Sequence, residues 1–324
     1  MSVLSLPTYT DVSDAAKRLS GAVCRTPILT SAALNEAAGA SCFFKAECLQ
    51  ETGSFKLRGA MNRLLQIPIE KRVAGVVAFS SGNHAQGIAR AANRMGMPAL
   101  IVMPEDAPSV KVEGVRSDGA EIRLYDRQTG SREEIAAEIA RERGAILVPS
   151  FDDPMIIAGQ GTCGLELSQQ VEDLDAVICC TGGGGLITGI ALAFERMSPG
   201  TQIWTAEPKG HEDWQRSLQL GNPVSNQPGT RSICDAILTP QPGAITWAVG
   251  KKLLTGGLAV GDEHIREAMR LAFRHLKVVV EPGGAAALAA ALFAFPNALR
   301  GKRIGIVLTG GNVDEALFAD VLAG

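Results

Sequence analysis

The stretch DAVICCTGGGGLITGIALAFERM, residues 175–197, contains a short apolar run, a turn of four glycines and an apolar segment with helical periodicity. The apolar run lacks polar alternation, which is typical of a strand buried on both faces of a sheet. A buried strand that leads directly into a helix is the repeating unit of parallel α/β proteins. This stretch therefore predicts an α/β fold built on parallel sheets that helices cover.

The same alternation continues on both sides of this stretch. Apolar runs precede helical patterns or form predicted central strands at 73–79, 98–104, 121–126, 145–150, 202–207 and 303–309. We expect residues 73–150 to form a smaller nested domain that carries a substrate loop. Residues 1–72 and 151–324 would then form the larger, cofactor-binding domain together.

Composition and charge exclude several classes of protein. The chain has 324 residues, of which 46% are hydrophobic and 20% charged, and its net charge is −3 without basic runs. A nucleic-acid partner is therefore not expected. The sequence shows neither a secretory signal nor a run of about 18 apolar residues, so we expect no membrane association. The adjacent Cys179 and Cys180 would point to opposite faces of a strand, as core residues of a reduced, cytoplasmic protein.

Three predicted strands end in turns that contain glycine: AFSSGNHAQG (78–87), CCTGGGGLITG (179–189) and VLTGGNVDEA (307–316). In parallel α/β proteins, ligands bind beyond the carboxyl ends of the strands. Glycine lets the backbone approach a ligand, and a following helix offers free N–H groups to an anion. The four glycines at 182–185 therefore predict a phosphate cradle. The alternative is a tight turn that packs a helix onto the sheet, for which one glycine would suffice.

The residues of the glycine turn exclude one class of phosphate-binding site. The turn has no lysine, so it is not a P-loop. Gly183, Gly185 and Gly189, with Glu207 at the end of the next strand, approximate a dinucleotide fingerprint. An NAD-binding oxidoreductase therefore stays open as an alternative. It leaves TGSFKLRGA, SSGNH and LTGGN without a role, however.

Pyridoxal phosphate would use all of these motifs. This cofactor needs a lysine for its Schiff base, a nest for its phosphate and polar contacts for its ring. Lys56 can supply the first, Asn83 suits the ring hydroxyl and Thr309 suits the ring nitrogen. The competing interpretation of Lys56 is a surface lysine at a helix start.

Six motifs in this order resemble those of the fold-type-II pyridoxal-phosphate enzymes: TGSFKLRGA, SSGNHAQGIA, IAGQGT, TGGGGLITGIA, EPGGAAALAA and LTGGNVD. The closest group is the serine/threonine dehydratases and serine racemases, which include 3-hydroxyaspartate dehydratases. The similarity runs from RTPILTSAALN (25–35) to LTGGNVDEA (308–316). It implies a tryptophan synthase β-like fold of two sheet domains.

The resemblance also implies a role for each motif. Lys56 would hold the cofactor and then act as a base on one face of the substrate, and Phe55 would wall the ring. Thr309 would donate to an unprotonated ring nitrogen, which favours β-elimination. The substrate carboxylate would bind to Ser80, Ser81, Gly82, Asn83 and His84. The phosphate would bind to Gly182, Gly183, Gly184, Gly185 and Leu186.

Ser81 has two interpretations. Serine racemases and hydroxyaspartate dehydratases carry serine at this position, where many biosynthetic threonine dehydratases carry alanine. The hydroxyl of Ser81 could exchange a proton on the face opposite Lys56, which would permit racemisation. It could instead only cap the helix that begins near His84.

AEPKGHEDW (206–214) resembles the divalent-cation site of the same family. Glu207 and Asp213 would supply carboxylates and His211 its backbone carbonyl to Mg²⁺, Ca²⁺ or Mn²⁺. The alternative is an acidic surface loop.

Two positions bear on the side chain of the substrate. Arg132 aligns with an arginine that meets a substrate's distal carboxylate in serine racemases, although it could simply pair with Glu133 on a helix surface. Before IAGQGT the family usually has a histidine-proline pair, whereas this chain has VPSFDDP. Ser150 and Phe151 would therefore alter the pocket.

We accordingly expect a pyridoxal-phosphate-dependent ammonia-lyase that converts a hydroxyamino acid of the serine/threonine type into a 2-oxo acid and ammonia. A 3-hydroxyaspartate dehydratase and a serine or aspartate racemase stay open as alternatives. A homodimer is expected from the resemblance alone.

Overall fold

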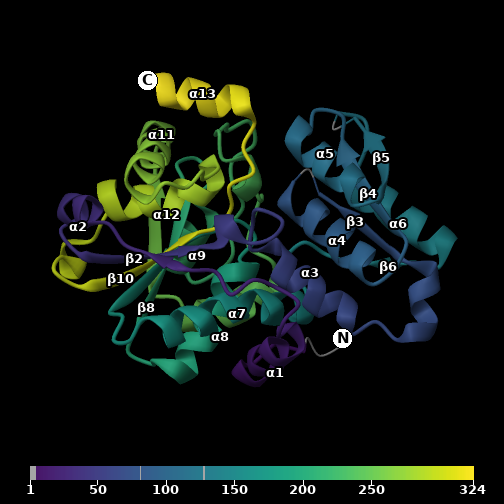
Figure 1. Cartoon of the computed structure of the whole chain (residues 1–324), viewed down its shortest axis with the longest axis horizontal. Coiled ribbons are helices and arrows are strands. Elements are labelled where there is room, and N and C mark those ends of the chain that lie inside the picture. Colours follow the sequence, from purple (N-terminus) through teal and green to yellow (C-terminus); the bar gives the residue numbers. More distant parts are fainter. Residues whose placement is uncertain (1–4, 81, 127) are drawn as a thin grey trace.

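The computed structural model describes residues 5–80, 82–126 and 128–324. Two sheets form the centres of two bodies that lie side by side, the larger on the left and the smaller on the right of Figure 1. Both are flanked by helices, so the predicted α/β class is confirmed. The predicted domain boundaries stay a prediction.

The larger sheet has six strands. Their order is β1 (Ile28–Leu29), β2 (Ser41–Ala46), β10 (Arg303–Leu308), β7 (Ala176–Cys180), β8 (Gln202–Pro208) and β9 (Gly256–Val260). Only β1 is antiparallel to its neighbour, while the other pairs are parallel. The smaller sheet is parallel throughout, with the order β5 (Glu121–Tyr125), β4 (Ala99–Pro104), β3 (Val76–Phe79) and β6 (Ile146–Leu147).

Helices cover both faces of the larger sheet. On one face, Val177 and Cys179 pack against α7 (Pro154–Gln170) and α8 (Gly185–Met197). On the other face, Ile178 and Cys180 share a core with α11 (Asp262–Leu271) and α12 (Pro282–Phe293). The two adjacent cysteines therefore face opposite sides of β7, as the strand period requires.

The smaller sheet is also covered on both faces. Its strands pack on α3 (Lys56–Leu65), α4 (Asn83–Arg94) and α5 (Ser109–Ser117) on one face, and on α6 (Arg132–Arg143) on the other. Helix α6 begins where the Ser131 hydroxyl accepts a hydrogen bond from the Glu134 N–H, and it ends at Gly144, which is left-handed. These cap residues explain the boundaries of α6.

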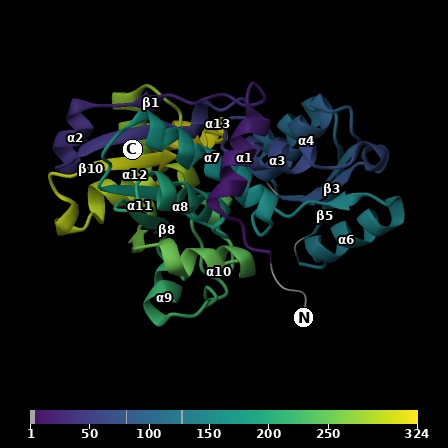
Figure 2. The same ribbon diagram turned by 90° about the horizontal axis from the view of Figure 1, so that it is seen from below.

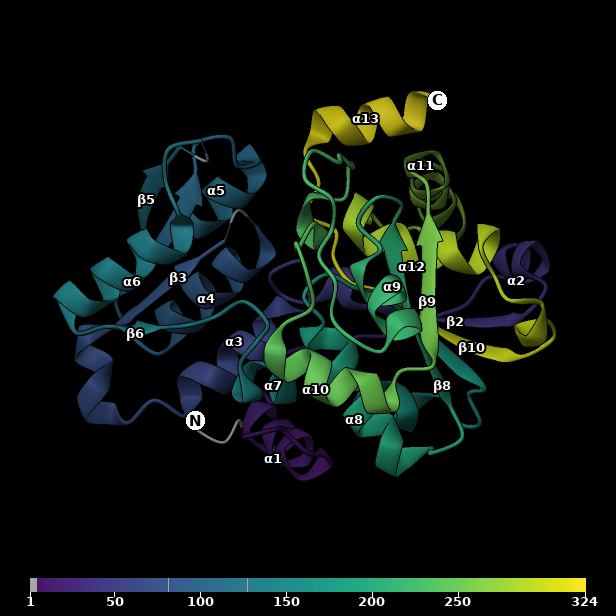
Figure 3. The same ribbon diagram turned by 180° about the vertical axis from the view of Figure 1, so that it is seen from behind.

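The remaining elements connect and flank the sheets. They are α1 (Tyr9–Leu19), α2 (Ala32–Ala38), α9 (Asp213–Leu220), α10 (Ala244–Leu253), α13 (Glu315–Ala323), the short 3₁₀-helices η1 (Glu47–Leu49), η2 (Ile69–Ala74), η3 (Asp235–Ile237) and η5 (Asn297–Leu299), and the π-helical turn η4 (Ala272–Leu276). Figure 2 shows α9 and α10 at the edge of the larger body beyond α8, and Figure 3 shows them on the side of β9.

One predicted strand begins later than expected. The apolar run at 73–79 predicts a strand, and the strand in the structure is confined to Val76–Phe79. The preceding residues form η2, which Gly75 ends with a φ of +74°. Glycine adopts such a positive φ at little cost, so Gly75 lets the chain leave the helix and enter the strand.

The carboxyl ends of β2, β3, β7 and β10 all lead into loops that line one pocket between the two sheets. This is where ligands bind in open parallel sheets. No helix among the described residues is both long and apolar enough to cross a membrane.

Candidate active site

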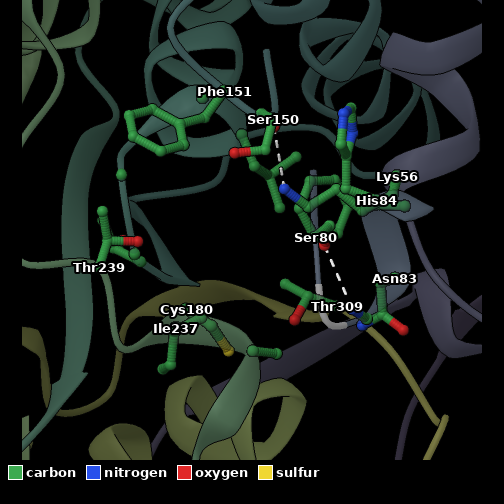
Figure 4. A pocket seen from close by; sticks show the side chains of 18 of the residues that line it. Lys56, Ser80, Asn83, His84, Ser150, Phe151, Cys180, Ile237, Thr239 and Thr309 are labelled. Carbon is green, nitrogen blue, oxygen red and sulfur yellow. Dashed lines mark hydrogen bonds between the residues drawn. The ribbon is translucent and has the colours of Figure 1, made fainter. Parts of the chain in front are cut away.

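The pocket is built from both bodies of the molecule. The glycine turn after β7 and Thr309 after β10 come from the larger sheet. Ser80, Gly82 and Asn83 follow β3 of the smaller one. Figure 4 shows Lys56, His84 and Asn83 on one side of the pocket and Phe151 and Thr239 on the other. The predicted motifs therefore meet at one place.

Backbone pairing places Lys56 beside the loop that carries Thr309. The Phe55 N–H donates to the Thr309 carbonyl at 3.1 Å, and the Gly311 N–H donates to the Gly53 carbonyl at 2.9 Å. Between these bonds, Ser54 and Gly310 form an isolated antiparallel bridge. This short pairing fixes the start of α3, and thus Lys56, against the end of β10.

Lys56 lies in an environment that favours its neutral form. Its Nζ donates to the Ser150 carbonyl at 3.0 Å and lies 5.2 Å from the centre of the Phe55 ring. Burial lowers the pKa of Lys56 from 10.5 to about 8, although the Glu281 carboxylate opposes the shift. A solvent-exposed lysine would not show this shift, so Lys56 is not an ordinary surface lysine, and its role in holding the cofactor stays a prediction.

The glycine turn presents N–H groups because its carbonyls are held elsewhere. The Gly182 carbonyl accepts from Trp214 Nε1 at 2.8 Å, and the Gly183 carbonyl accepts from Thr246 Oγ1 at 2.7 Å. Among the described residues, no acceptor is found for the N–H groups of Gly182 to Gly184. Unpaired N–H groups at the start of a helix are the kind of groups that bind anions, and phosphate binding here stays a prediction.

Steric contacts explain why this turn consists of glycine. A Cβ on Gly182 would lie 2.9 Å from Thr239 Oγ1, and a Cβ on Gly183 would enter the Phe151 ring. Gly184 has a φ of +97°, which side chains disfavour. The close packing that glycine permits brings the backbone to the wall of the pocket. Leu186 in the first turn of α8 also lines it.

The loop after β3 is held by its own polar groups and by the larger body. Ser80 Oγ accepts from the Gly82 N–H at 3.2 Å. The Asn83 amide donates to Glu281 Oε1 and accepts from Asn312 Nδ2 at 2.9 Å. Asn83 is therefore fixed in orientation, with its side chain at the pocket. Ser81, predicted to be a second catalytic residue, lies outside the described residues.

His84 lies on the buried side of the pocket. Burial and the nearby charge of Lys56 lower the pKa of His84 to about 3, so the ring is neutral near pH 7. Its Nε2 lies 3.4 Å from the Val148 carbonyl. This arrangement is consistent with a role in holding the loop rather than in proton transfer.

Arg132, at the start of α6, lines the same pocket as Lys56. Its guanidinium lies 5.6 Å from the centre of the Phe79 ring, and its Nε donates to Glu133 at 2.9 Å. The predicted pair with Glu133 is present, yet the guanidinium also borders the pocket. The binding of a substrate's distal carboxylate by Arg132 stays a prediction.

Thr309 and Cys180 form an uncharged part of the wall. Both side chains line the pocket, and the Cys180 thiol accepts a hydrogen bond from the Ala287 N–H at 3.3 Å. Burial raises the pKa of Cys180 to about 11, so the thiol is not ionised near neutral pH. Neither residue carries a negative charge, so these two side chains would leave a neighbouring ring nitrogen without an anionic partner.

Glu207, His211 and Asp213 lie outside the pocket lining, near the start of α9. Glu207 accepts hydrogen bonds from the N–H groups of Trp214 at 2.8 Å and Gln215 at 2.9 Å. Asp213 Oδ2 is buried without a hydrogen-bond partner, and burial raises the pKa of Asp213 to about 7. Within the described ranges, no three His, Cys, Asp or Glu side chains are grouped to hold a metal. A cation here would therefore need backbone carbonyls and water as ligands.

Several lining residues received no role in the sequence analysis. Glu281 begins the EPGGAAALAA motif, which was recognised without a function for this carboxylate. Asp235 to Thr239 also line the pocket, and no local sequence pattern indicates it. One local feature of the sequence could have indicated a role for Glu281: it is a carboxylate that lies just before Pro282, at the start of an apolar helix.

Comparison with known proteins shows which family of enzymes the chain resembles. The family model described as "Pyridoxal-phosphate dependent enzyme" matches residues 19–310. This range contains Lys56, the glycine turn and Thr309, so the NAD alternative loses its basis.

Named relatives match over nearly their whole length. L-threo-3-hydroxyaspartate ammonia-lyase of Saccharomyces cerevisiae is 44% identical over 320 residues, which cover 98% of this chain and 97% of the yeast protein. Serine racemase of Schizosaccharomyces pombe is 41% identical, with 99% and 98% covered. The solved structure of maize serine racemase superposes with a TM-score of 0.93 at 38% identity, with 98% of each chain covered.

Proposed function

The chain belongs to the pyridoxal-phosphate dependent enzymes, and we propose that it is an ammonia-lyase with 3-hydroxyaspartate as its main substrate. The observation that carries this proposal is the presence of Arg132 and Lys56 in one pocket. A lysine of lowered pKa suits proton abstraction, and a guanidinium suits a second carboxylate. Similarity to 3-hydroxyaspartate ammonia-lyase supports the same substrate class.

The residues of the pocket fit pyridoxal phosphate. The free N–H groups of the glycine turn and the positive end of α8 suit its phosphate. Lys56 would hold the cofactor covalently, with Phe55 against the ring, Asn83 at its hydroxyl and Thr309 at its nitrogen. Bound pyridoxal phosphate supplies an electron-withdrawing ring that acidifies the α-proton of the attached amino acid.

Lys56 would then take the α-proton. With a pKa of about 8, roughly a tenth of a free amine is neutral at pH 7, against less than a thousandth for an ordinary lysine. The Ser150 carbonyl, 3.0 Å from Nζ, gives the protonated amine a hydrogen-bond acceptor. Lys56 can therefore both accept a proton and be held in place afterwards.

The substrate carboxylate next to the α-carbon would bind at the loop Ser80–His84. This loop offers hydroxyl groups and the N–H groups at the start of α4, which favour an anion. We propose Ser81 as the proton-exchanging group on the other face. Loss of the α-proton and the β-hydroxyl followed by hydrolysis yields ammonia and a 2-oxo acid, which is oxaloacetate for this substrate.

Arg132 would bind the distal carboxylate. Its guanidinium is already ordered over Phe79, so little side-chain freedom remains to be lost on binding. Serine and threonine lack this carboxylate. Arg132 would therefore separate 3-hydroxyaspartate from the smaller hydroxyamino acids.

A divalent cation is proposed at Asp213, Glu207 and the His211 carbonyl. The free buried oxygen of Asp213 and the closeness of two carboxylates fit a cation, because both favour added positive charge. The site lies away from the pocket, so the cation would stabilise α9. Helix α9 carries Trp214, which holds the Gly182 carbonyl.

The test measures ammonia release from each stereoisomer of 3-hydroxyaspartate, serine and threonine. The variant Arg132→Ala should lower kcat/KM for 3-hydroxyaspartate by about 30- to 1,000-fold, equivalent to about 2–4 kcal/mol, and leave serine turnover nearly unchanged. The control Arg143→Ala removes an exposed arginine, paired with Glu121, from the other end of α6. Equal losses on both substrates, or preferred release from threonine, would refute the assignment.

Racemisation is the second candidate, because serine racemases are among the relatives of this chain. Loss of chirality, recorded in the same reactions, distinguishes it from elimination. Rapid loss of chirality with little ammonia would assign the protein as a racemase.

A further inference from the structure

Lys111, on α5, is a buried lysine to which the proposed chemistry gives no role. Only 2% of its side chain is exposed. Its Nζ lies 2.6 Å from Asp235 Oδ2 and 3.3 Å from Glu281 Oε2. A buried ammonium is tolerated only where carboxylates offset the loss of hydration, and here two of them do.

These three charges connect the two bodies of the molecule. Lys111 belongs to the smaller body, whereas Asp235 in η3 and Glu281 at the start of α12 belong to the larger one. Both carboxylates line the pocket that contains Lys56. The bridge therefore crosses between the sheets at the edge of the active site.

Two contacts link this bridge to the substrate loop. Glu281 Oε1 accepts the hydrogen bond from the Asn83 amide. The aliphatic chain of Lys111 packs under Gly82, where a Cβ would lie 3.1 Å from Lys111 Cδ. One lysine therefore supports the loop backbone directly and the Asn83 side chain through Glu281.

Because these charges interact, the loss of Lys111 would weaken the hydrogen bond between Glu281 and Asn83. Burial lowers the pKa of Lys111, but Glu281 and Asp235 reverse the shift and keep it charged. Burial raises the pKa of Glu281, and Lys111 opposes that rise. Without Lys111, the carboxyl of Glu281 would protonate more readily and become a weaker acceptor for Asn83.

We propose that Lys111 is a positioning residue that clamps the two sheets together through Asp235 and Glu281, and so holds Gly82 and Asn83 in the arrangement that binds the substrate's α-carboxylate. The inference rests on the proposed role of this loop. It predicts a larger defect in substrate binding than in proton abstraction, because Lys56 forms neither an ion pair nor a hydrogen bond with the bridge and is influenced only by the charge of Glu281.

The experiment compares holoenzyme variants. Lys111→Met keeps the length of the side chain without its charge, and Arg116→Met is the control, which removes an exposed charge from the same helix. Glycine is the binding probe, since it has an α-carboxylate but no β-hydroxyl to eliminate. Its binding is followed by the change in cofactor absorbance, in parallel with kcat and KM for 3-hydroxyaspartate.

Lys111→Met should raise both the Kd for glycine and KM about tenfold or more, with kcat changed less than about threefold. In Lys111→Met/Glu281→Gln the uncompensated carboxylate is absent, so the double variant should bind glycine no more weakly than Lys111→Met alone. If Lys111→Met does not fold, Asp235→Asn breaks the same bridge from its exposed end and should raise the Kd in the same direction.

Unchanged glycine affinity in the folded variants, or an additive loss in the double variant, would overturn the role of Lys111. A wild-type enzyme that binds glycine but releases no ammonia from any 3-hydroxy amino acid would instead refute the proposed function. The two failures are therefore distinguishable.

Discussion

Asp152 is expected to couple the stability of α10 to retention of the cofactor. Its carboxylate accepts three hydrogen bonds from the first turn of that helix, from the N–H groups of Ala244 and Ile245 at 2.9 Å and of Thr246 at 3.1 Å. It is thus an N-cap supplied from a distant part of the chain. Thr246 in turn holds the Gly183 carbonyl, so fraying of α10 would loosen the glycine turn.

The magnitude for Asp152→Ala follows from these contacts. Loss of an N-cap costs about 1–2 kcal/mol, and loss of a negative charge at a helix N-terminus adds about 0.3–1 kcal/mol. A chain of 324 residues unfolds with an entropy of roughly 0.7 kcal/mol/K, so Tm of the apoprotein should fall by about 2–4 °C. Loosening of the glycine turn should also weaken cofactor binding about tenfold, or about 1.4 kcal/mol.

The assay combines thermal melting of the apoprotein with titration of pyridoxal phosphate followed by absorbance. Asp153→Ala is the matched control, because Asp153 caps the adjacent helix α7 through the N–H groups of Met155 and Ile156. Both variants should lose stability, but only Asp152→Ala should lose cofactor affinity. A stability loss in Asp152→Ala with unchanged affinity would refute the link from α10 to the glycine turn.

Three further outcomes follow from the site. Capture of pyridoxal phosphate by the apoprotein should accelerate about tenfold per pH unit up to about pH 8 and then level off, because only the neutral amine of Lys56 reacts; acceleration that continued towards pH 10 would contradict its lowered pKa. Mg²⁺ added to chelator-treated protein should raise Tm, and Asp213→Asn should abolish the rise; a response that persists in the variant would place the cation elsewhere. Arg58→Met should destabilise the fold by about 3–5 kcal/mol, seen as a lower denaturation midpoint, since Glu47 would stay buried without its partner; a midpoint equal to wild type would contradict this.

Much of the site could be predicted from the sequence because its parts follow strand ends. Lys56, the glycine turn and Thr309 each lie in a short motif whose chemistry is local. The carboxyl ends of neighbouring parallel strands lie at one edge of a sheet, so these motifs had to converge. The structure places all three in one pocket.

The contacts that tune these groups could not be predicted in this way. Lys56 is held by a carbonyl that is 94 residues away, and Lys111 is bridged to a carboxylate that is 124 residues away. Nothing in SVKVEGVRSDG distinguishes Lys111 from a lysine on a helix surface. Its burial depends on how the two bodies pack, which local patterns do not encode. The homodimer and the cytoplasmic location stay predictions.

The uncharged part of the pocket wall that Thr309 and Cys180 form bears on which reaction the site favours. Thr309 supplies a hydroxyl, and Cys180 supplies a thiol whose pKa is raised to about 11 by burial. On the proposed assignment, Thr309 donates to an unprotonated ring nitrogen, and such a ring withdraws electrons less strongly than a protonated one. A reaction that proceeds through a long-lived carbanion at the α-carbon would then be disfavoured. Elimination depends less on a stable carbanion, because the departing β-hydroxyl takes an electron pair with it. Lys56 alone would suit many reactions of amino acids, so on this assignment an uncharged hydroxyl and thiol beside the ring nitrogen would favour loss of a β-substituent.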